Sequence, residues 1–159
     1  MKNKPLKIHP KLLYFLLGIV VVVSAMLTVV VVRHRHGAYP GRVFINDQTF
    51  HVEIADTETK QSVGLMFRKE LPERCGMLFI FTEPAIRHFW MRNTYIPLDI
   101  IFIDDQRRII NIRTMPPLTD ETCASERPAL YVLELQAGSA KQYNLQPTLP
   151  VKIELPERP

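Results

Sequence analysis

The chain has 159 residues and a formal net charge of +4, from 20 basic and 16 acidic residues. Residues 1–36 hold six of the basic residues and no acidic one, so the remainder has a net charge of −2. This length allows one ordinary domain and an appendage. Because the basic character belongs to the N-terminal segment alone, the composition argues against nucleic-acid binding, and we predict no nucleic-acid partner.

The appendage is an uncharged apolar run over residues 12–32, LLYFLLGIVVVVSAMLTVVVV. As an α-helix it would extend about 30 Å, which matches the hydrocarbon core of a bilayer. A cleaved signal peptide is the alternative, but its apolar region would be shorter and small residues would follow it. Here the basic and bulky residues 33–36 (RHRH) follow. We therefore predict a single transmembrane helix that stays uncleaved.

The charges that flank this run predict its orientation. Four lysines precede it, at positions 2, 4, 7 and 11, and only Arg33 and Arg35 follow closely. This excess favours a cytoplasmic N-terminus. We predict a cytoplasmic basic N-terminus (1–11), a juxtamembrane linker (33–41) and an outward-facing β-rich domain (42–156). The protein would be a single-pass protein of the inner (cytoplasmic) membrane, with its C-terminal domain in the periplasm.

The outward-facing domain is rich in the short alternating apolar segments that are typical of strands. Residues 42–45 and 49–55 flank Asn46-Asp47, a pattern that predicts an opening hairpin. Asp56 and Thr57 indicate the start of a helix that runs to about Phe67. Further strands are predicted over 76–81, 88–91, 98–104, 108–115, 130–135 and 150–155, and a second short helix over 137–143. The expected class is α+β and mainly β, a small barrel- or sandwich-like sheet with one packed helix.

Two cysteines, Cys75 and Cys123, lie in the predicted outward-facing domain. In an oxidising compartment such a pair is a candidate disulfide. Closing a loop of this length would stabilise the fold by about 4 kcal/mol in the simple entropy model. The alternative is two separate thiols, one of them packed among apolar side chains, because sequence does not show whether the Cα atoms approach each other.

Several motifs resemble a known family. The strings GLMFR (64–68), GMLFIF (76–81), FWMRNTYIPLDIIFID (89–104) and LYVLEL followed by Ala137-Gly138 resemble the domain of unknown function 192 family of bacteria and archaea. The resemblance covers residues 50–155 and implies a compact β-barrel-like fold, usually exported or membrane-anchored, with no established activity. The chain departs from the family pattern at residues 144–150 (NLQPTLP), where a Gly-Asp turn would be expected.

Asp99 is a lone carboxylate at the start of the apolar strand 98–104. Because an unpaired carboxylate is costly among apolar neighbours, we expect it to be protonated, hydrogen-bonded or paired with Arg68 or Arg92. In one interpretation it holds the turn at residues 93–97 by accepting backbone N–H bonds. In the other, Asp99 and an arginine line a pocket beside Trp90, with neutral donors from Asn93.

Trp90 is the only tryptophan. We expect its side chain either to pack in the core beneath the helix or to form the floor of a pocket. Glu134, between two leucines of the strand 130–135, is interpreted as half-buried or as an ordinary solvent-facing or arginine-paired acid. No closely spaced ligand set predicts a metal site, and no cofactor is predicted. The candidate ligand-binding residues are Trp90, Arg68, Arg92, Asn93, Asp99 and Glu134.

The sequence thus predicts a membrane-anchored domain that binds a small molecule or a component of the cell envelope. One alternative is a hydrolase that acts on an envelope glycan through Asp99 and Glu134, the best available carboxylate pair. Another is a structural partner of a second membrane protein, with no pocket. The sequence leaves open whether the domain is an enzyme.

Overall fold

The computed structural model describes residues 17–24, 26 and 39–156. The chain divides into two compact units, Met1–Ala38 and Tyr39–Pro159. In the first unit the described residues are helical, and their apolar side chains are exposed. Within the described part of the chain, no helix combines the length and the apolar character that crossing a membrane requires.

Much of the predicted membrane topology falls on residues that the structure does not describe. Residues 12–16, 25 and 27–32 of the predicted span lie outside the described residues, as do the predicted basic N-terminus and residues 33–38 of the predicted linker. The transmembrane helix, its orientation and the periplasmic location therefore stay predictions.

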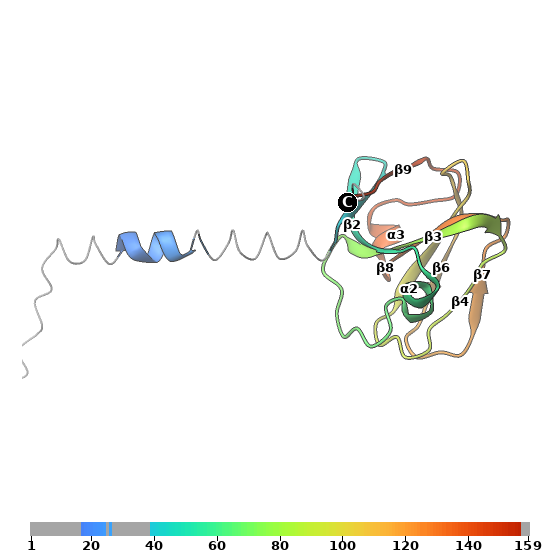
Figure 1. Ribbon diagram of the computed structural model, residues 1–159, viewed down its shortest axis with the longest axis horizontal. Coiled ribbons are helices and arrows are strands. Elements are labelled where there is room, and N and C mark those ends of the chain that lie inside the picture. The colour runs from blue at the N-terminus through green and yellow to red at the C-terminus, as the bar shows by residue number, and fades with distance from the viewer. Residues whose placement is uncertain (1–16, 25, 27–38, 157–159) are drawn as a thin grey trace, which may run out of the picture. The chain divides into compact units, whose positions relative to one another are not determined.

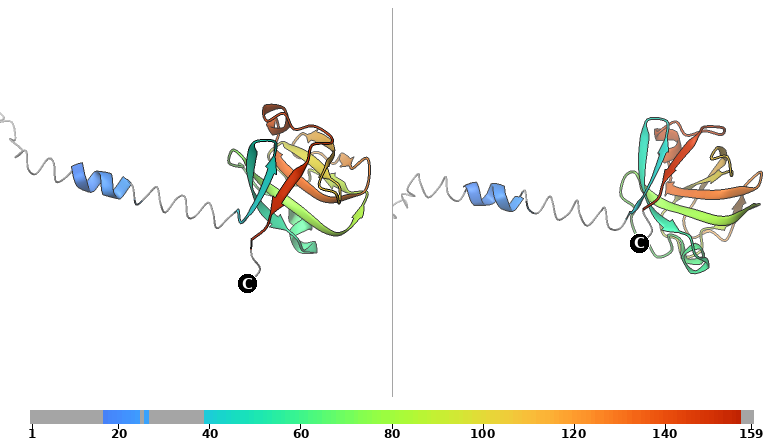
Figure 2. Two further views of the ribbon diagram at one scale, coloured as in Figure 1. Left: turned by 90° about the horizontal axis from the view of Figure 1, so that it is seen from above. Right: turned by 45° about the horizontal axis from the view of Figure 1, so that its top comes forward.

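The second unit is built around a seven-stranded sheet with the strand order β6-β5-β8-β3-β2-β1-β9 (Figures 1 and 2). Its strands are β1 (Gly41–Ile45), β2 (Gln48–Ala55), β3 (Cys75–Ala85), β5 (Leu98–Ile103), β6 (Ile109–Met115), β8 (Ala129–Gln136) and β9 (Val151–Glu154). Neighbouring strands are antiparallel, except that β2 and β3 are parallel and are joined by a crossover that contains helix α2 (Glu58–Val63). A separate two-stranded sheet pairs β4 (His88–Trp90) with β7 (Thr122–Ala124). A second short helix, α3 (Ser139–Gln142), precedes the last strand.

The large sheet curls into a half-barrel (Figure 2). Its two edge strands, β6 and β9, meet at one end, where Arg108 forms an isolated bridge with Pro150. The Ile109 amide donates to the Leu149 carbonyl at 3.0 Å, and the Val151 amide donates to the Arg107 carbonyl at 2.8 Å. These bonds satisfy part of the backbone that an open sheet would leave unpaired.

Each face of the sheet has its own apolar cluster. The inner cluster joins residues from both edges of the sheet, such as Val43, Ile109 and Val151, and fills the half-barrel. The outer cluster includes Phe102 on β5 and is covered by Leu65 and Met91, with Phe89 packed against it. This covering layer buries the outer face, so central strands have apolar side chains on both sides.

Most of the predicted elements are present. The hairpin of β1 and β2 turns at Asn46 and Asp47, and Asn46 has a φ of 53°, as tight hairpin turns require. The predicted mainly β class is confirmed, but α2 buries no residue and is not the packed helix that was expected. It ends at Val63 and not near Phe67, because Gly64 follows with a φ of 49° and its amide donates to the Lys60 carbonyl.

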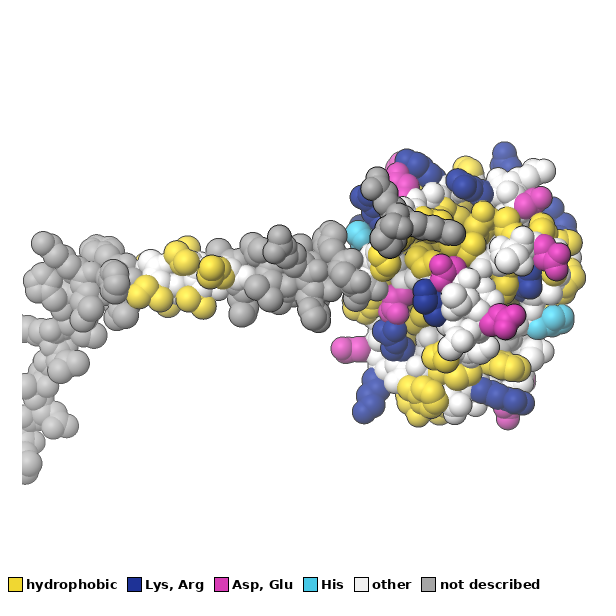
Figure 3. All heavy atoms as spheres, in the orientation of Figure 1, with side chains coloured by type: hydrophobic (Ala, Val, Ile, Leu, Met, Phe, Trp, Pro, Cys, Tyr) yellow, Lys and Arg dark blue, Asp and Glu magenta, His cyan; other side chains and the backbone are white. Residues whose placement is uncertain are grey.

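Basic and acidic side chains are interspersed on the face that Figure 3 displays. On the visible part of that face the Lys and Arg side chains do not form a stripe.

Candidate functional site

A cavity of about 120 Å³ lies where the segment that follows α2 approaches β3, β4 and β8. Its lining includes Gln61, Ser62 and Gly64 from α2 and the segment after it, and the aromatic residues Phe79, Phe89 and Trp90 from β3 and β4. A groove of about 420 Å³ shares Gln61, Ser62, Phe79, His88 and Phe89 with this cavity. The cavity and the groove thus share a wall.

Glu134 lines the cavity from the centre of the large sheet. On β8 its neighbours Leu133 and Leu135 belong to the inner cluster, so Glu134 points toward the opposite, outer face. Its partners across the strands are Met77 on β3 and Ile100 on β5, and both are apolar and buried. The local alternation of the sequence therefore places a carboxyl group in an apolar layer.

Burial dominates the electrostatics of Glu134. The residue is 4% exposed, and its Oε2 atom has no hydrogen-bond partner among the described residues. Desolvation raises the pKa of the Glu134 carboxyl from its ordinary 4.5 to about 8, because a charged carboxylate is disfavoured away from water. The arginine partner and the solvent-facing position considered for Glu134 are both absent from this part of the structure.

Strand β4 brings Trp90 to the cavity. The pairing of β4 with β7 places Trp90 opposite Thr122, and the residue is 49% exposed. The Arg92 guanidinium lies 5.3 Å from the centre of the Trp90 ring, and its Nε donates to Asp120 at 2.7 Å. Trp90 is therefore a wall of the cavity next to solvent and is not core packing beneath α2.

Gly64 leaves space beside Phe79 and Glu134. Besides its positive φ, a Cβ at this position would lie 3.2 Å from the Phe79 ring and 3.9 Å from Glu134 Oε2. A larger residue would therefore strain the backbone and reduce the space above the carboxyl group.

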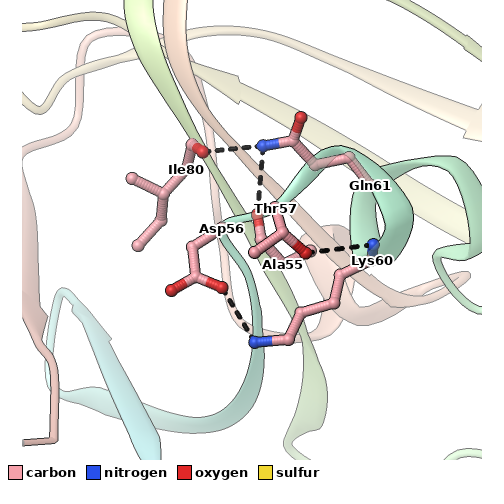
Figure 4. A network of polar contacts seen from close by, with 6 residues as sticks. All are labelled: Ala55, Asp56, Thr57, Lys60, Gln61 and Ile80. Carbon is pink, nitrogen blue, oxygen red and sulfur yellow. Dashed lines mark hydrogen bonds and ion pairs between the residues drawn. The ribbon is translucent and has the colours of Figure 1, made fainter.

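The polar groups of the wall are held by bonds within the chain. The Gln61 side-chain amide donates to the Ile80 carbonyl at 2.8 Å and to the Ala55 carbonyl at 3.3 Å, and its oxygen points away from both (Figure 4). Thr57 caps the same helix by accepting from the Lys60 amide. Helix α2 is thereby fixed to β2 and β3 by hydrogen bonds although it has no buried side chain.

Asp99 lies on the other side of the sheet. It is 1% exposed, accepts from the Thr114 hydroxyl at 2.7 Å and accepts from the Ala140 amide at 2.8 Å. The expectation of a buried, hydrogen-bonded acid is met. The expected partners were wrong, because Thr114 faces Asp99 across the β5–β6 pair and Ala140 belongs to α3.

Three other predicted site residues lie apart from the cavity wall. Arg68 pairs with Glu53 at 2.7 Å, and Arg92 is engaged by Asp120. Asn93 is exposed with a φ of 55°, and its carbonyl accepts from the Phe67 amide at 2.7 Å. Of the six candidates the cavity is lined by Trp90 and Glu134, and Arg92 reaches it only through the Trp90 ring.

The carboxylate pair of the hydrolase alternative is also corrected. Asp99 is paired with Leu135, and Glu134 is paired with Ile100. Cross-strand partners share a face of a sheet, so the two acids point to opposite faces. They cannot flank one glycosidic bond.

The predicted disulfide is not present. Both cysteines are buried thiols with no bond between them. They belong to different sheets, where Cys75 faces His51 on β2 and Cys123 faces Phe89 on β4. Burial, with a smaller effect of the Glu134 charge, raises the pKa of Cys123 to about 11, so this thiol is a poor nucleophile at neutral pH.

The sequence analysis missed several wall residues, namely Gln61, Ser62, Phe79 and Phe89. None of these four carried a sequence signal, whereas Trp90 stood out as the only tryptophan and Glu134 as a charged residue within an apolar strand.

Comparisons with known proteins place this fold in a family. The chain matches the family model DUF192, described as "Uncharacterized ACR", over residues 42–153. No curated protein gives a significant match.

Two solved structures are similar. One is a Novosphingobium aromaticivorans protein of unknown function, with 38% identity, a TM-score of 0.67, and coverage of 70% of this chain and 82% of the other. The second is a Sinorhizobium meliloti protein described as a candidate transcription regulator, with 33% identity, a TM-score of 0.66, and coverage of 70% of this chain and 90% of the other.

Proposed function

We propose that this chain, which belongs to the DUF192 family, is a membrane-anchored binding domain that takes one small chemical group into the cavity above Glu134. The group would be a part of a small molecule or of a cell-envelope component. The neighbouring groove would hold the rest of a larger ligand, since it shares a wall with the cavity.

The observation that carries the proposal is the unsatisfied oxygen of Glu134. A buried polar atom without a hydrogen bond destabilises a fold by about 1–3 kcal/mol. Such groups are rare in folded proteins, and this one faces a cavity lined by aromatic side chains. A ligand that bonds to Oε2 would remove this penalty.

The size of the cavity limits what can enter. An apolar cavity of about 150 Å³ holds benzene, and one water needs about 10–15 Å³. The cavity of about 120 Å³ therefore suits a side chain or a single small ring, not a whole cofactor. The alternative of a structural partner was tied to the absence of a pocket, and the presence of this cavity favours the binding function over it.

The anchor is the second part of the proposal. The apolar run 12–32 and its flanking lysines support a single span with the N-terminus in the cytoplasm. The described residues 17–24 are helical with exposed apolar side chains, as a helix surrounded by lipid would be. A reporter enzyme fused to the C-terminus should be active only outside the cytoplasm, and cytoplasmic activity would contradict this topology.

Native mass spectrometry of the full chain, extracted from its host in a non-ionic detergent, tests the binding function. The blocking variant is Ser62→Phe, and its control is Thr59→Phe on the same helix, since both positions are exposed and only Ser62 lines the cavity. We expect a retained small molecule in the wild type and in Thr59→Phe, and its loss in Ser62→Phe. No retained molecule in any of them, or equal retention in all three, would contradict the proposal.

A further inference from the structure

The chemistry of the ligand can be inferred from the polar atoms that the cavity leaves available, provided that the proposed binding function holds. Most donors in the wall are already used within the chain. The amides of Gly64, Met66 and Thr94 donate to backbone carbonyls, and so does the Thr94 hydroxyl. Both bonds of the Gln61 side-chain nitrogen also end on backbone carbonyls.

Apart from the Trp90 indole N–H, which belongs to a half-exposed residue, the atoms that remain are mainly acceptors. They are Glu134 Oε2, the Gln61 side-chain oxygen and the lone pairs of the Thr94 hydroxyl. The Ser62 hydroxyl and the His88 imidazole can act in either sense, and both residues are exposed at the rim. When Glu134 is ionised, acceptors outnumber donors in this lining, which selects a ligand group that is rich in donors.

The apolar part of the wall favours a positive charge on that group. Phe79 and Phe89 meet edge to face with ring centres 4.9 Å apart, and Trp90 completes an aromatic surround. Aromatic faces attract cations and do not attract anions. The nearby arginines are engaged elsewhere, because Arg92 pairs with Asp120 and Arg87 donates to the carbonyls of Glu83 and Ala129.

We propose that the cavity binds the ammonium group of a primary alkylamine, with the nitrogen donating to Glu134 Oε2 and Gln61 and with the alkyl stem against Trp90 and Phe89. The same chemistry is offered by a free amine and by a lysine side chain. An ammonium has three donors and a positive charge, and both match what the wall leaves unsatisfied.

Binding of an ammonium should be linked to proton release. Burial keeps the Glu134 carboxyl neutral below about pH 8, and the ammonium needs the carboxylate. Other titratable groups around the carboxyl are Cys123 on β7 and His88 on β4, with Glu58 and Arg87 in the groove. The affinity should therefore rise about tenfold for each pH unit up to about pH 8, and one proton should leave for each amine bound.

Titration of the full chain with n-butylamine, n-butanol and butyrate tests this inference. Trp90 is the only tryptophan and lines the cavity, so its fluorescence reports occupancy directly. Calorimetry in two buffers of different ionisation enthalpy counts the released protons. We expect the amine to bind at least about tenfold more tightly than the alcohol, and butyrate not to bind.

Variants separate this inference from the proposed function. Glu134→Gln should weaken amine binding at least about tenfold and remove its pH dependence, Ser62→Phe should block every probe, and Thr59→Phe should behave as the wild type. If the alcohol or butyrate binds as well as the amine and Ser62→Phe blocks it, the cavity binds ligands but the assignment of an amine is wrong. If no probe binds the wild type, the assignment of an amine fails, and the native mass spectrometry of the wild type and Ser62→Phe decides whether the binding function fails with it.

A second amine distinguishes the two sources. Nα-acetyl-lysinamide carries the same ammonium on a longer body that would reach the groove. Tighter binding of this compound than of n-butylamine would assign the ligand to a lysine side chain, and the reverse order would assign it to a free amine. Failure of both amines, while the alcohol binds, would overturn the inference.

Discussion

Asp99 and Glu134 are both buried acids on the neighbouring strands β5 and β8, and they face opposite sides of one sheet. Asp99 points into the half-barrel and accepts hydrogen bonds from Thr114 and Ala140. Glu134 points to the outer layer, where its Oε2 has no partner among the described residues. Both acids are buried, but only Glu134 has a carboxyl oxygen without a hydrogen-bond partner among the described residues.

This difference indicates a structural role for Asp99 and fits the binding role that we propose for Glu134. The bonds of Asp99 tie α3 to β5 and β6, so this acid acts as a structural link between distant parts of the chain. Glu134 makes no such link and lines an open cavity. A buried acid with its partners stabilises a fold, whereas one without a partner weakens it and is available to a ligand.

The largest effect is expected for Asp99→Ala. It removes two hydrogen bonds to a carboxylate and leaves the Ala140 amide unsatisfied, so the free energy of unfolding should fall by about 4 kcal/mol. Urea unfolding followed by Trp90 fluorescence measures it. The exposed acid Asp120 is the control, and Asp120→Ala should lose less than about 1 kcal/mol. Equal losses of unfolding free energy in the two variants would contradict a structural role for Asp99.

The next effect is on the pH dependence of stability. The folded-state pKa of Glu134, about 8, lies above its ordinary 4.5, so the folded protein holds a proton that the unfolded chain releases. The contribution of Glu134 to the free energy of unfolding should therefore be greatest at low pH and fall by about 3 kcal/mol between about pH 5 and pH 8, then level off. Glu134→Gln should lack this component. A pH profile that is unchanged by Glu134→Gln would show that the acid is solvated.

Glu134→Leu should raise stability while it abolishes binding. Leucine has a similar volume and no polar atom to leave unsatisfied, so we expect the free energy of unfolding to increase by about 1–2 kcal/mol at neutral pH. Glu134→Ala is the comparison, because it should lose stability by enlarging the cavity. A destabilised leucine variant would mean that the carboxyl group has a structural partner.

The smallest effect is expected at Arg68. Its ion pair with Glu53 lies near the surface, so Arg68→Gln should change stability by less than about 1 kcal/mol. Amine binding, measured by Trp90 fluorescence, should not change, because Arg68 is not among the residues that line the cavity. A tenfold loss of affinity for the amine would contradict this and show that Arg68 belongs to the binding site.

The strands were predictable because their alternation is local. Two features of the fold were not predicted. Strand β7 was missed because its three residues, 122–124, show no alternation and pair only with β4. The helix α2 was extended too far because Gly64 was interpreted as a helical residue.

The site was less predictable than the fold. The burial of Asp99 followed from its apolar neighbours, but its bond to Ala140 joins residues 41 positions apart in the chain. Glu134 could be recognised as unusual within its strand. Its lack of a partner depends on Met77 and Ile100 across the sheet and on the layer that covers them, which no local pattern encodes.

The most direct measurement is a carbon NMR titration of the Glu134 carboxyl group in the full chain, assigned by comparison with Glu134→Gln. The account predicts a midpoint near pH 8, which moves to lower pH when n-butylamine is added. A midpoint near the ordinary value of 4.5 in the free protein would contradict it, because the carboxyl group would then be hydrated or paired.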